Sequence, residues 1–251
     1  MKREELMELF VGRNLDEERR SRKGKDEIPF WVSLNWQFDI DALEAQVREL
    51  HKWHCLEFEK THVETYQGLL AGGNYQDYFH LSLSHPKALA VDLQKRLDEE
   101  RGIKWQDRKL SVQKRMQSMW KINEDYDPLI DERNFEVPEE ALEKAPELRK
   151  VLQQCKARVT RVRVARLNSF QPLAPHVDLS PKFALRIHIP LATNRLAFNF
   201  AMPEDQVHAR HIKRGEVVLL NSGVTHWAHN FGETPRDHLI ICIDGQEDLD
   251  H

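Results

Sequence analysis

The chain has 251 residues, and its 37 Lys and Arg residues against 41 Asp and Glu give a formal net charge of −4 at pH 7. This balance provides no strong positive field, so it argues against a dedicated nucleic-acid-binding protein. The N-terminus is charged from Lys2 onward, and no stretch reaches the roughly 18 apolar residues that a membrane span needs. We therefore expect a cytoplasmic protein without a membrane span. Three widely spaced cysteines indicate reduced thiols instead of a disulfide framework.

Residues 1–27 are dominated by charge and are expected to form a lead-in, whereas residues 28–251 are expected to form a single domain. Residues 30–36 alternate like a first strand, and Asp39 or Asp41 can cap the helix that follows. The region 39–155 is predicted to be a helical support. Its further predicted helices cover residues 86–101, 109–122 and 138–155, and the last of them begins with a proline and two glutamates.

A β core is predicted over residues 158–244, because alternation of apolar and polar residues begins at residue 158 and continues to 167. Further strands are predicted at 184–190, 196–200, 216–220 and 238–243, a spacing typical of a sandwich or barrel. In the first of these, Leu185, Ile187 and Ile189 share one face, while Arg186 and His188 share the other face and can line a pocket. The basic run at 158–163 is expected to balance nearby acids, although one of its arginines could turn inward to a substrate carboxylate.

The triplet His176-Val177-Asp178, followed much later by His226, suggests a metal centre. The triplet alone is a weak signal, since 13 His and 41 acidic residues predict about two such triplets by chance. The chain has a second one, His62-Val63-Glu64, but only the first lies within the strand-like region. Two imidazoles and one carboxylate are the ligand set that holds Fe(II) on one face and leaves the other positions open. His176 and Asp178 would point to the same side of an extended segment, and a closed sheet could bring His226 to them.

Arg236 lies at the start of the last predicted strand, where its guanidinium could bind the far end of a dicarboxylate through paired hydrogen bonds. Alternation places Arg236 on the same face as His238 and Ile240, away from Leu239 and Ile241.

Together these segments resemble the aspartyl/asparaginyl β-hydroxylase-like family of Fe(II)/2-oxoglutarate-dependent dioxygenases, which includes amino-acid hydroxylases such as proline hydroxylase. The resemblance covers roughly residues 158–244. It implies a mainly β fold with helices (α+β), in which a double-stranded β-helix (jelly-roll, cupin-like) core has helices packed on one side. The segments that carry the resemblance are Pro175–Asp178, Leu185–Leu191, Arg214–Glu216, Asn221, His226–Asn230 and Arg236.

The resemblance also implies roles for individual residues. His176, Asp178 and His226 would be the iron ligands, and O2 and 2-oxoglutarate the cosubstrates. Arg236 would bind the side-chain carboxylate of 2-oxoglutarate and His188 its other carboxylate, while Arg186 would serve either the cosubstrate or the substrate. Structural alternatives remain for three of them: a buried hydrogen-bonded imidazole for His188, an ion pair for Arg186 and a surface charge for Arg236. Because Asp178 is present, hydroxylation is favoured over halogenation, although desaturation and cyclisation use the same metal site.

The sequence leaves three functions open. The leading hypothesis is hydroxylation of a free amino acid or a similar small polar metabolite, with release of succinate and CO2. It is favoured because the members that modify protein domains are membrane-anchored, whereas no span is found in this chain. The second keeps the chemistry but takes a protein side chain or a lipid-linked headgroup as substrate. The third is a barrel that binds a metal or metabolite without turnover, or uses Zn or Mn for redox-neutral chemistry.

Overall fold

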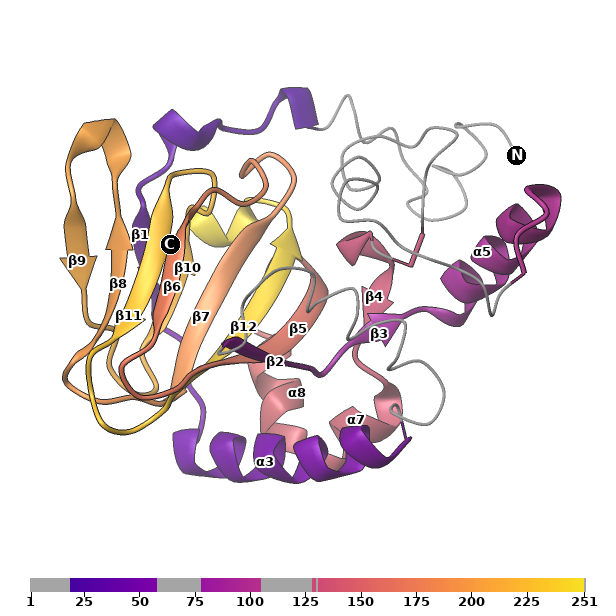
Figure 1. Ribbon diagram of the computed structural model, residues 1–251, viewed down its shortest axis with the longest axis horizontal. Helices are drawn as coiled ribbons and strands as arrows, with labels where there is room; N and C mark the ends of the chain where they lie inside the picture. The colour runs from indigo at the N-terminus through magenta and orange to yellow at the C-terminus, as the bar shows by residue number, and fades with distance from the viewer. Residues whose placement is uncertain (1–18, 58–77, 105–127, 130, 251) are drawn as a thin grey trace.

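The computed structural model describes residues 19–57, 78–104, 128–129 and 131–250 (Figure 1). Two antiparallel sheets form the centre of the molecule. The larger has the strand order β1-β10-β7-β12-β5-β2, and the smaller has the order β6-β11-β8-β9. A separate pair, β3 and β4, connects to the helical part of the chain.

The larger sheet consists of β1 (Trp31–Leu34), β2 (Tyr78–Ser82), β5 (Arg158–Leu167), β7 (Leu185–Ala192), β10 (Val217–Leu220) and β12 (Arg236–Asp244). The smaller sheet consists of β6 (Pro172–His176), β8 (Ala197–Ala201), β9 (His208–Arg210) and β11 (His226–Asn230). The short pair is β3 (His85–Pro86) and β4 (Phe135–Glu136). The α-helices are α3 (Ile40–Glu57), α5 (Ala88–Glu100), α7 (Glu139–Lys144) and α8 (Pro146–Leu152). The 3-10 helices are η1 (Lys25–Glu27), η3 (Glu132–Asn134), η4 (Pro203–Asp205) and η5 (Glu247–Leu249).

The main hydrophobic core lies between the larger sheet and the helices α3, α7 and α8, which cover one of its faces (Figure 1). Leu43 of α3 and Leu148 of α8 are fully buried there, against Leu185, Ile187 and Ile189 of β7. The predicted alternation in β7 is therefore confirmed. Because side chains alternate along a strand, the polar positions of β7 and β12 are left on the opposite face, toward the smaller sheet.

The strands of the larger sheet agree best with the prediction. The observed β5 has the predicted bounds, and the predicted strands at 184–190, 216–220 and 238–243 differ from β7, β10 and β12 by a few residues at their ends. The sequence analysis missed β2, β3, β4, β6, β9 and β11. Strand β6 contains Pro172 and Pro175, which argue against a strand, but β6 is an edge strand and there a missing N–H is tolerated. Strand β11 has no aliphatic alternation to reveal it.

The helices agree less well. Asp39 is the cap of α3, since its Oδ1 accepts from the backbone N–H groups of Asp41 at 2.9 Å and Ala42 at 3.1 Å. The single helix predicted at 138–155 is wrong: the chain forms α7 and α8. Pro146 has no N–H to donate, and it pushes Ala145 out of the helical region, to φ −128° and ψ 69°. The helix predicted at 86–101 starts later, because Pro86 pairs in β3, and the helix predicted at 109–122 lies outside the described residues.

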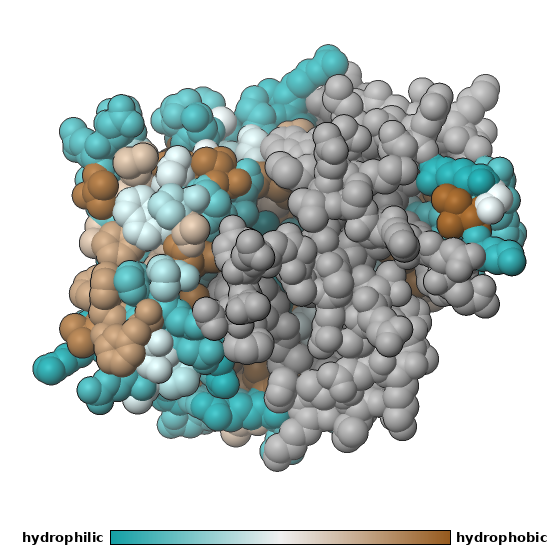
Figure 2. All heavy atoms as spheres, in the orientation of Figure 1, coloured by the Kyte–Doolittle hydropathy of each residue, from teal (hydrophilic) through white to brown (hydrophobic). Residues whose placement is uncertain are grey.

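The fold is mainly β with helices on one side, a double-stranded β-helix as predicted. Residues 19–27 contact this core: Arg22 donates to Asp244 at 2.8 Å, and the amide of Asn221 donates to the Lys25 carbonyl at 2.7 Å. The division into a lead-in and a domain stays a prediction. No helix in the described ranges is long and apolar enough to cross a membrane. On the face shown in Figure 2, hydrophilic and hydrophobic residues are interspersed over β8, β9 and β11.

Candidate metal centre

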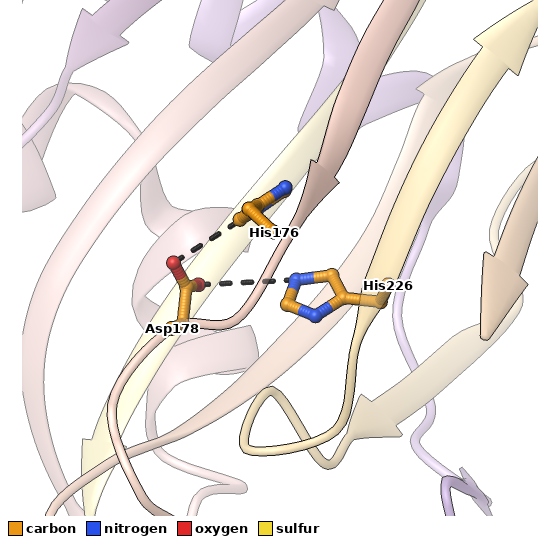
Figure 3. Close-up of side chains that lie close together, drawn as sticks. All are labelled: His176, Asp178 and His226. Carbon is orange, nitrogen blue, oxygen red and sulfur yellow. Dashed lines mark ion pairs between the residues drawn. The ribbon is translucent and has the colours of Figure 1, made fainter. Parts of the chain in front are cut away.

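The structure brings His176, Asp178 and His226 together (Figure 3), and all three line a cavity that residues of both sheets enclose. His176 ends β6 and His226 begins β11, and the two residues are paired across these neighbouring strands. Their ring centroids are 4.4 Å apart. Asp178 lies two residues beyond β6, where its backbone N–H donates to the Ser222 carbonyl at 2.9 Å. One ligand atom from each side chain lies within 4.8 Å of the other two.

Both imidazoles are oriented in the same way by the backbone. Nδ1 of His176 is 2.8 Å from the Ala174 carbonyl, and Nδ1 of His226 is 2.8 Å from the Val224 carbonyl. A carbonyl can only accept, so each Nδ1 carries a proton, and the Nε2 atoms of His176 and His226 lie 3.9 Å and 4.0 Å from the Asp178 carboxylate. Burial lowers the pKa of His226, which keeps this ring neutral near pH 7. A backbone bond to the far nitrogen is the usual support of a metal-binding histidine.

Arg186 orients the carboxylate of Asp178 through a hydrogen bond. Its Nε donates to Oδ2 of Asp178 at 2.7 Å, and its Nη1 lies 3.4 Å from Glu132 and 2.5 Å from the Cys242 sulfur. Burial raises the pKa of Asp178, but Arg186 and the two histidines outweigh burial and hold this pKa well below its usual range. Asp178 is therefore an anion at neutral pH, the form in which a carboxylate binds a metal.

A buried ion-pair network surrounds the guanidinium of Arg186. Glu132 in η3 also lies 3.1 Å from Arg161 and 3.9 Å from Arg163, both on β5. Burial raises the pKa of Glu132, but Arg186, Arg161 and Arg163 outweigh burial and bring it to about 2. The sequence analysis missed Glu132, since it lies in a segment without periodicity. The expectation that the basic run balances nearby acids is met by Arg161 and Arg163, and by Arg158, whose partner is Asp244 at 3.0 Å.

The cavity behind the three side chains is lined by both sheets, and Arg236, His188 and Arg163 all contribute to it. Arg236 is only 6% exposed, so the alternative of a plain surface charge is wrong. Its Nη2 donates to Oδ1 of Asn199 at 2.6 Å, and its Nε donates to Nε2 of His238 at 2.8 Å. The sequence analysis assigned neither Asn199 nor His238 to the site, although alternation had placed His238 on the same face as Arg236.

The donor set fits a divalent transition metal together with an acidic cosubstrate. Two imidazoles and one carboxylate on one side of a cavity suit Fe(II), and they leave the cavity side open to further ligands. Nε2 of His188 is buried and has no hydrogen-bond partner among the described residues. A buried polar atom of this kind calls for a partner, and a carboxylate oxygen entering the cavity would provide one.

Comparisons with solved structures find distant likenesses. An oxidoreductase of the 2OG-Fe(II) oxygenase family from Burkholderia pseudomallei is 14% identical with a TM-score of 0.33, over 42% of this chain and 54% of that chain. A cupin domain protein from Bordetella pertussis is 16% identical with a TM-score of 0.29, over 37% of this chain and 88% of that chain. The matched part thus spans about half the length of the Burkholderia protein, and neither likeness bears on the substrate.

A family model described as aspartyl/asparaginyl β-hydroxylase matches residues 83–244, which is more than half of the chain. The match includes all three residues of the candidate metal centre, Arg186 with its ion-pair network, and the cavity residues His188 and Arg236. The chain therefore belongs to the aspartyl/asparaginyl β-hydroxylase family.

Proposed function

We propose that the protein is an Fe(II)- and 2-oxoglutarate-dependent dioxygenase that hydroxylates a C–H bond of a free amino acid or a similar small polar metabolite. One observation carries this proposal: two backbone-oriented imidazoles and an arginine-oriented carboxylate converge within 4.8 Å in the lining of a cavity that Arg236 also lines. Membership in a family of hydroxylases supports the reaction class.

His176, Asp178 and His226 would hold the metal, each through the atom that its partners leave available. Iron bound there with 2-oxoglutarate supplies the oxidising chemistry, in which O2 and 2-oxoglutarate are converted to succinate, CO2 and one hydroxyl on the substrate. The work of the protein is positioning, because the C–H bond that lies closest to the metal is the one that reacts.

Arg236 would bind the carboxylate of 2-oxoglutarate that lies farthest from the metal. Its guanidinium is buried and held by Asn199 and His238, so it loses little conformational freedom on binding. His188 would donate to the same cosubstrate through Nε2. Nε of Arg186 contacts Asp178, and its Nη1 contacts Glu132 and Cys242, which supports a role in holding the metal ligand.

The charge of the cavity supports an acidic substrate group. Arg163 lines the same cavity as Arg236, and its Nη1 lies 3.9 Å from Oε1 of Glu132. Among the described residues, Arg163, Arg186 and Arg236 line this cavity together with one carboxylate, that of Asp178, so the lining favours an acidic group such as the carboxylate of an amino acid. Arg163 is therefore our candidate for the residue that binds the substrate carboxylate.

The test is to incubate the protein with Fe(II), 2-oxoglutarate and a panel of metabolites under air, and to measure succinate together with the mass of each metabolite. We expect one metabolite to gain one oxygen atom with matching succinate release. Asp178→Ala should lose more than about 100-fold of this activity, beyond the range of changes to outer-shell partners. His208→Ala, which changes an exposed histidine of β9, is the matched control and should retain the activity.

The role of Arg163 has a separate test with the substrate so identified. Arg163→Gln should raise KM for the substrate at least tenfold with little change in KM for 2-oxoglutarate, whereas Arg158→Gln should change neither. Activity only on peptides or lipid extracts would overturn the proposed substrate class. Failure to bind both metal and 2-oxoglutarate would overturn the proposed reaction.

A further inference from the structure

Asn199 lines the cavity from β8, which lies between β11 and β9 in the smaller sheet. It is 5% exposed. The residues two positions away along β8 are alanines on both sides, and its partner in β11 is Ala228. Its partner in β9, Arg210, donates to Ser33 of β1 at 2.8 Å. Because side chains two apart in a strand and opposite across strands share a face, the small alanines leave room beside the amide of Asn199 for a ligand.

The contact with Arg236 fixes which way the amide of Asn199 points. A guanidinium has only N–H donors, and Nη2 of Arg236 lies 2.6 Å from Oδ1 of Asn199. The reversed amide would set donors against each other across this distance, so the carbonyl oxygen faces Arg236 and the NH2 group does not. Among the described residues Nδ2 of Asn199 has no hydrogen-bond partner, and it is not fully buried. Its two N–H groups can therefore donate to a ligand in the cavity.

Arg236 and Asn199 thus offer a ligand donors and no free amide acceptor. A carboxylate fits such a pair, since both of its oxygens accept and about four lone-pair sites are available. An amide of the same shape fits badly, because its own NH2 group would face one of the donors and leave it unpaired. The positive charge of Arg236 acts in the same direction, since it attracts the carboxylate and not the amide.

We propose that Asn199 is a ligand-binding residue that donates through Nδ2 to the same carboxylate as Arg236, and that the pair selects a carboxylate over its uncharged amide. This gives Asn199 a contact with the ligand in addition to its support of Arg236. The identity of the ligand as 2-oxoglutarate rests on the proposed function, whereas the carboxylate site itself does not.

The first experiment is NMR spectroscopy of the metal-free, ¹⁵N-labelled protein. The side-chain amide signal of Asn199 is identified by its loss in Asn199→Asp, and the probe is glutarate, a diacid without a keto group. We expect saturating glutarate to shift this signal downfield, because the N–H groups then donate to a charged acceptor. Glutarate binding that leaves the signal in place would restrict Asn199 to holding Arg236 and overturn the inference, as would a complete lack of glutarate binding.

The second experiment measures selectivity in the Mn(II)-loaded protein by titration calorimetry. The probes are N-oxalylglycine, in which an N–H replaces one CH2 of 2-oxoglutarate, and the amide of its glycine carboxylate. The wild-type protein should bind the acid at least 100-fold more tightly than the amide. Asn199→Ala should weaken binding of the acid about tenfold, the lower end for a hydrogen bond to a charged group. In Asn199→Asp the new carboxylate repels the acid and accepts from the amide, so the preference for the acid should fall at least tenfold.

Asn35→Asp is the matched control, because it makes the same chemical change at an exposed position between β1 and α3. It should change neither the amide signal of Asn199 nor the preference for the acid. A preference in Asn199→Asp equal to that of the wild-type protein would overturn the inference. If glutarate shifts the Asn199 signal but the metal-loaded protein binds neither probe, the carboxylate site is supported and the proposed function alone fails.

Discussion

At the scale of single residues, the candidate metal centre depends on how Asp178 is held. Its carboxylate receives a hydrogen bond from Nε of Arg186 at 2.7 Å, and Arg186 is in turn fixed by Glu132 and Cys242. A bidentate or forked guanidinium contact cannot be reproduced by an ammonium group, even though the charge is the same. The geometry of the site therefore predicts that metal binding depends on the shape of the Arg186 side chain as well as on its charge.

We predict that Arg186→Lys weakens Fe(II) binding by about 10- to 100-fold, because the Asp178 carboxylate loses the donor that orients it. The measurement is anaerobic titration calorimetry with Fe(II). Arg166→Lys is the matched control, since Arg166 makes a two-pronged contact with Asp237 at 2.7 Å away from the cavity. Equal metal affinity in Arg186→Lys and the wild-type protein would show that Asp178 is oriented by something else.

At the scale of elements, the sequence predicted those parts of the site that follow from alternation. The faces of β7 and β12 could be assigned because side chains alternate along a strand, and this placed Arg186, His188 and Arg236 on one surface. The pairing of His176 with His226 could not be predicted in the same way, since β6 contains prolines and β11 has no aliphatic pattern.

Other features depend on contacts between segments that are distant in the sequence. Glu132 lies in a short 3-10 helix, and only the folded chain brings it to the arginines of β5 and β7. The roles of Asn199 and His238 depend in the same way on the position of Arg236 between two sheets. Family resemblance supplied the expected ligands, but it did not supply these supporting residues.

The loop after β7 contacts the loop between β11 and β12, and this contact gives a prediction about stability. The side-chain amide of Asn194, after β7, donates to Asn230 at 2.9 Å and to the Thr234 carbonyl at 3.0 Å. A Cβ atom added at Gly232 would overlap this amide, which its hydrogen bonds prevent from moving away. We predict that Gly232→Ala lowers the free energy of unfolding by about 1–3 kcal/mol, the usual cost of overpacking.

Urea denaturation of a double-mutant cycle checks the cause of this loss. If the clash with Asn194 is responsible, the double variant Gly232→Ala, Asn194→Ala should lose less stability than the sum of the two single variants. Strict additivity would instead attribute the loss to the backbone of the loop.

At the scale of the whole molecule, the cluster around Glu132 joins the helical part of the chain to both the sheet and the metal centre. Glu132 is buried in η3 and pairs with Arg161 of β5 and Arg186 of β7. Its pKa of about 2 lies below the ordinary value of 4.5, despite the opposing effect of burial. A depressed pKa in the folded state means that the unfolded chain takes up this proton more readily. The stability from Glu132 is therefore fully present above about pH 4.5, and it is lost as the pH falls toward 2.

The lowered pKa of Glu132 gives a prediction about the stability of the protein in acid. Glu132→Gln should lower the free energy of unfolding at pH 7 by on the order of 3 kcal/mol, because three guanidiniums then lose their shared carboxylate. The difference from the wild-type protein should shrink as the pH falls from 4.5 toward 2, where the wild-type carboxylate is itself protonated. Urea denaturation of the metal-free protein at several pH values measures this difference in the free energy of unfolding. Glu136→Gln, at an exposed position of β4, is the control. A deficit that stays constant over this pH range would mean that Glu132 stabilises the fold through packing and not through its charge.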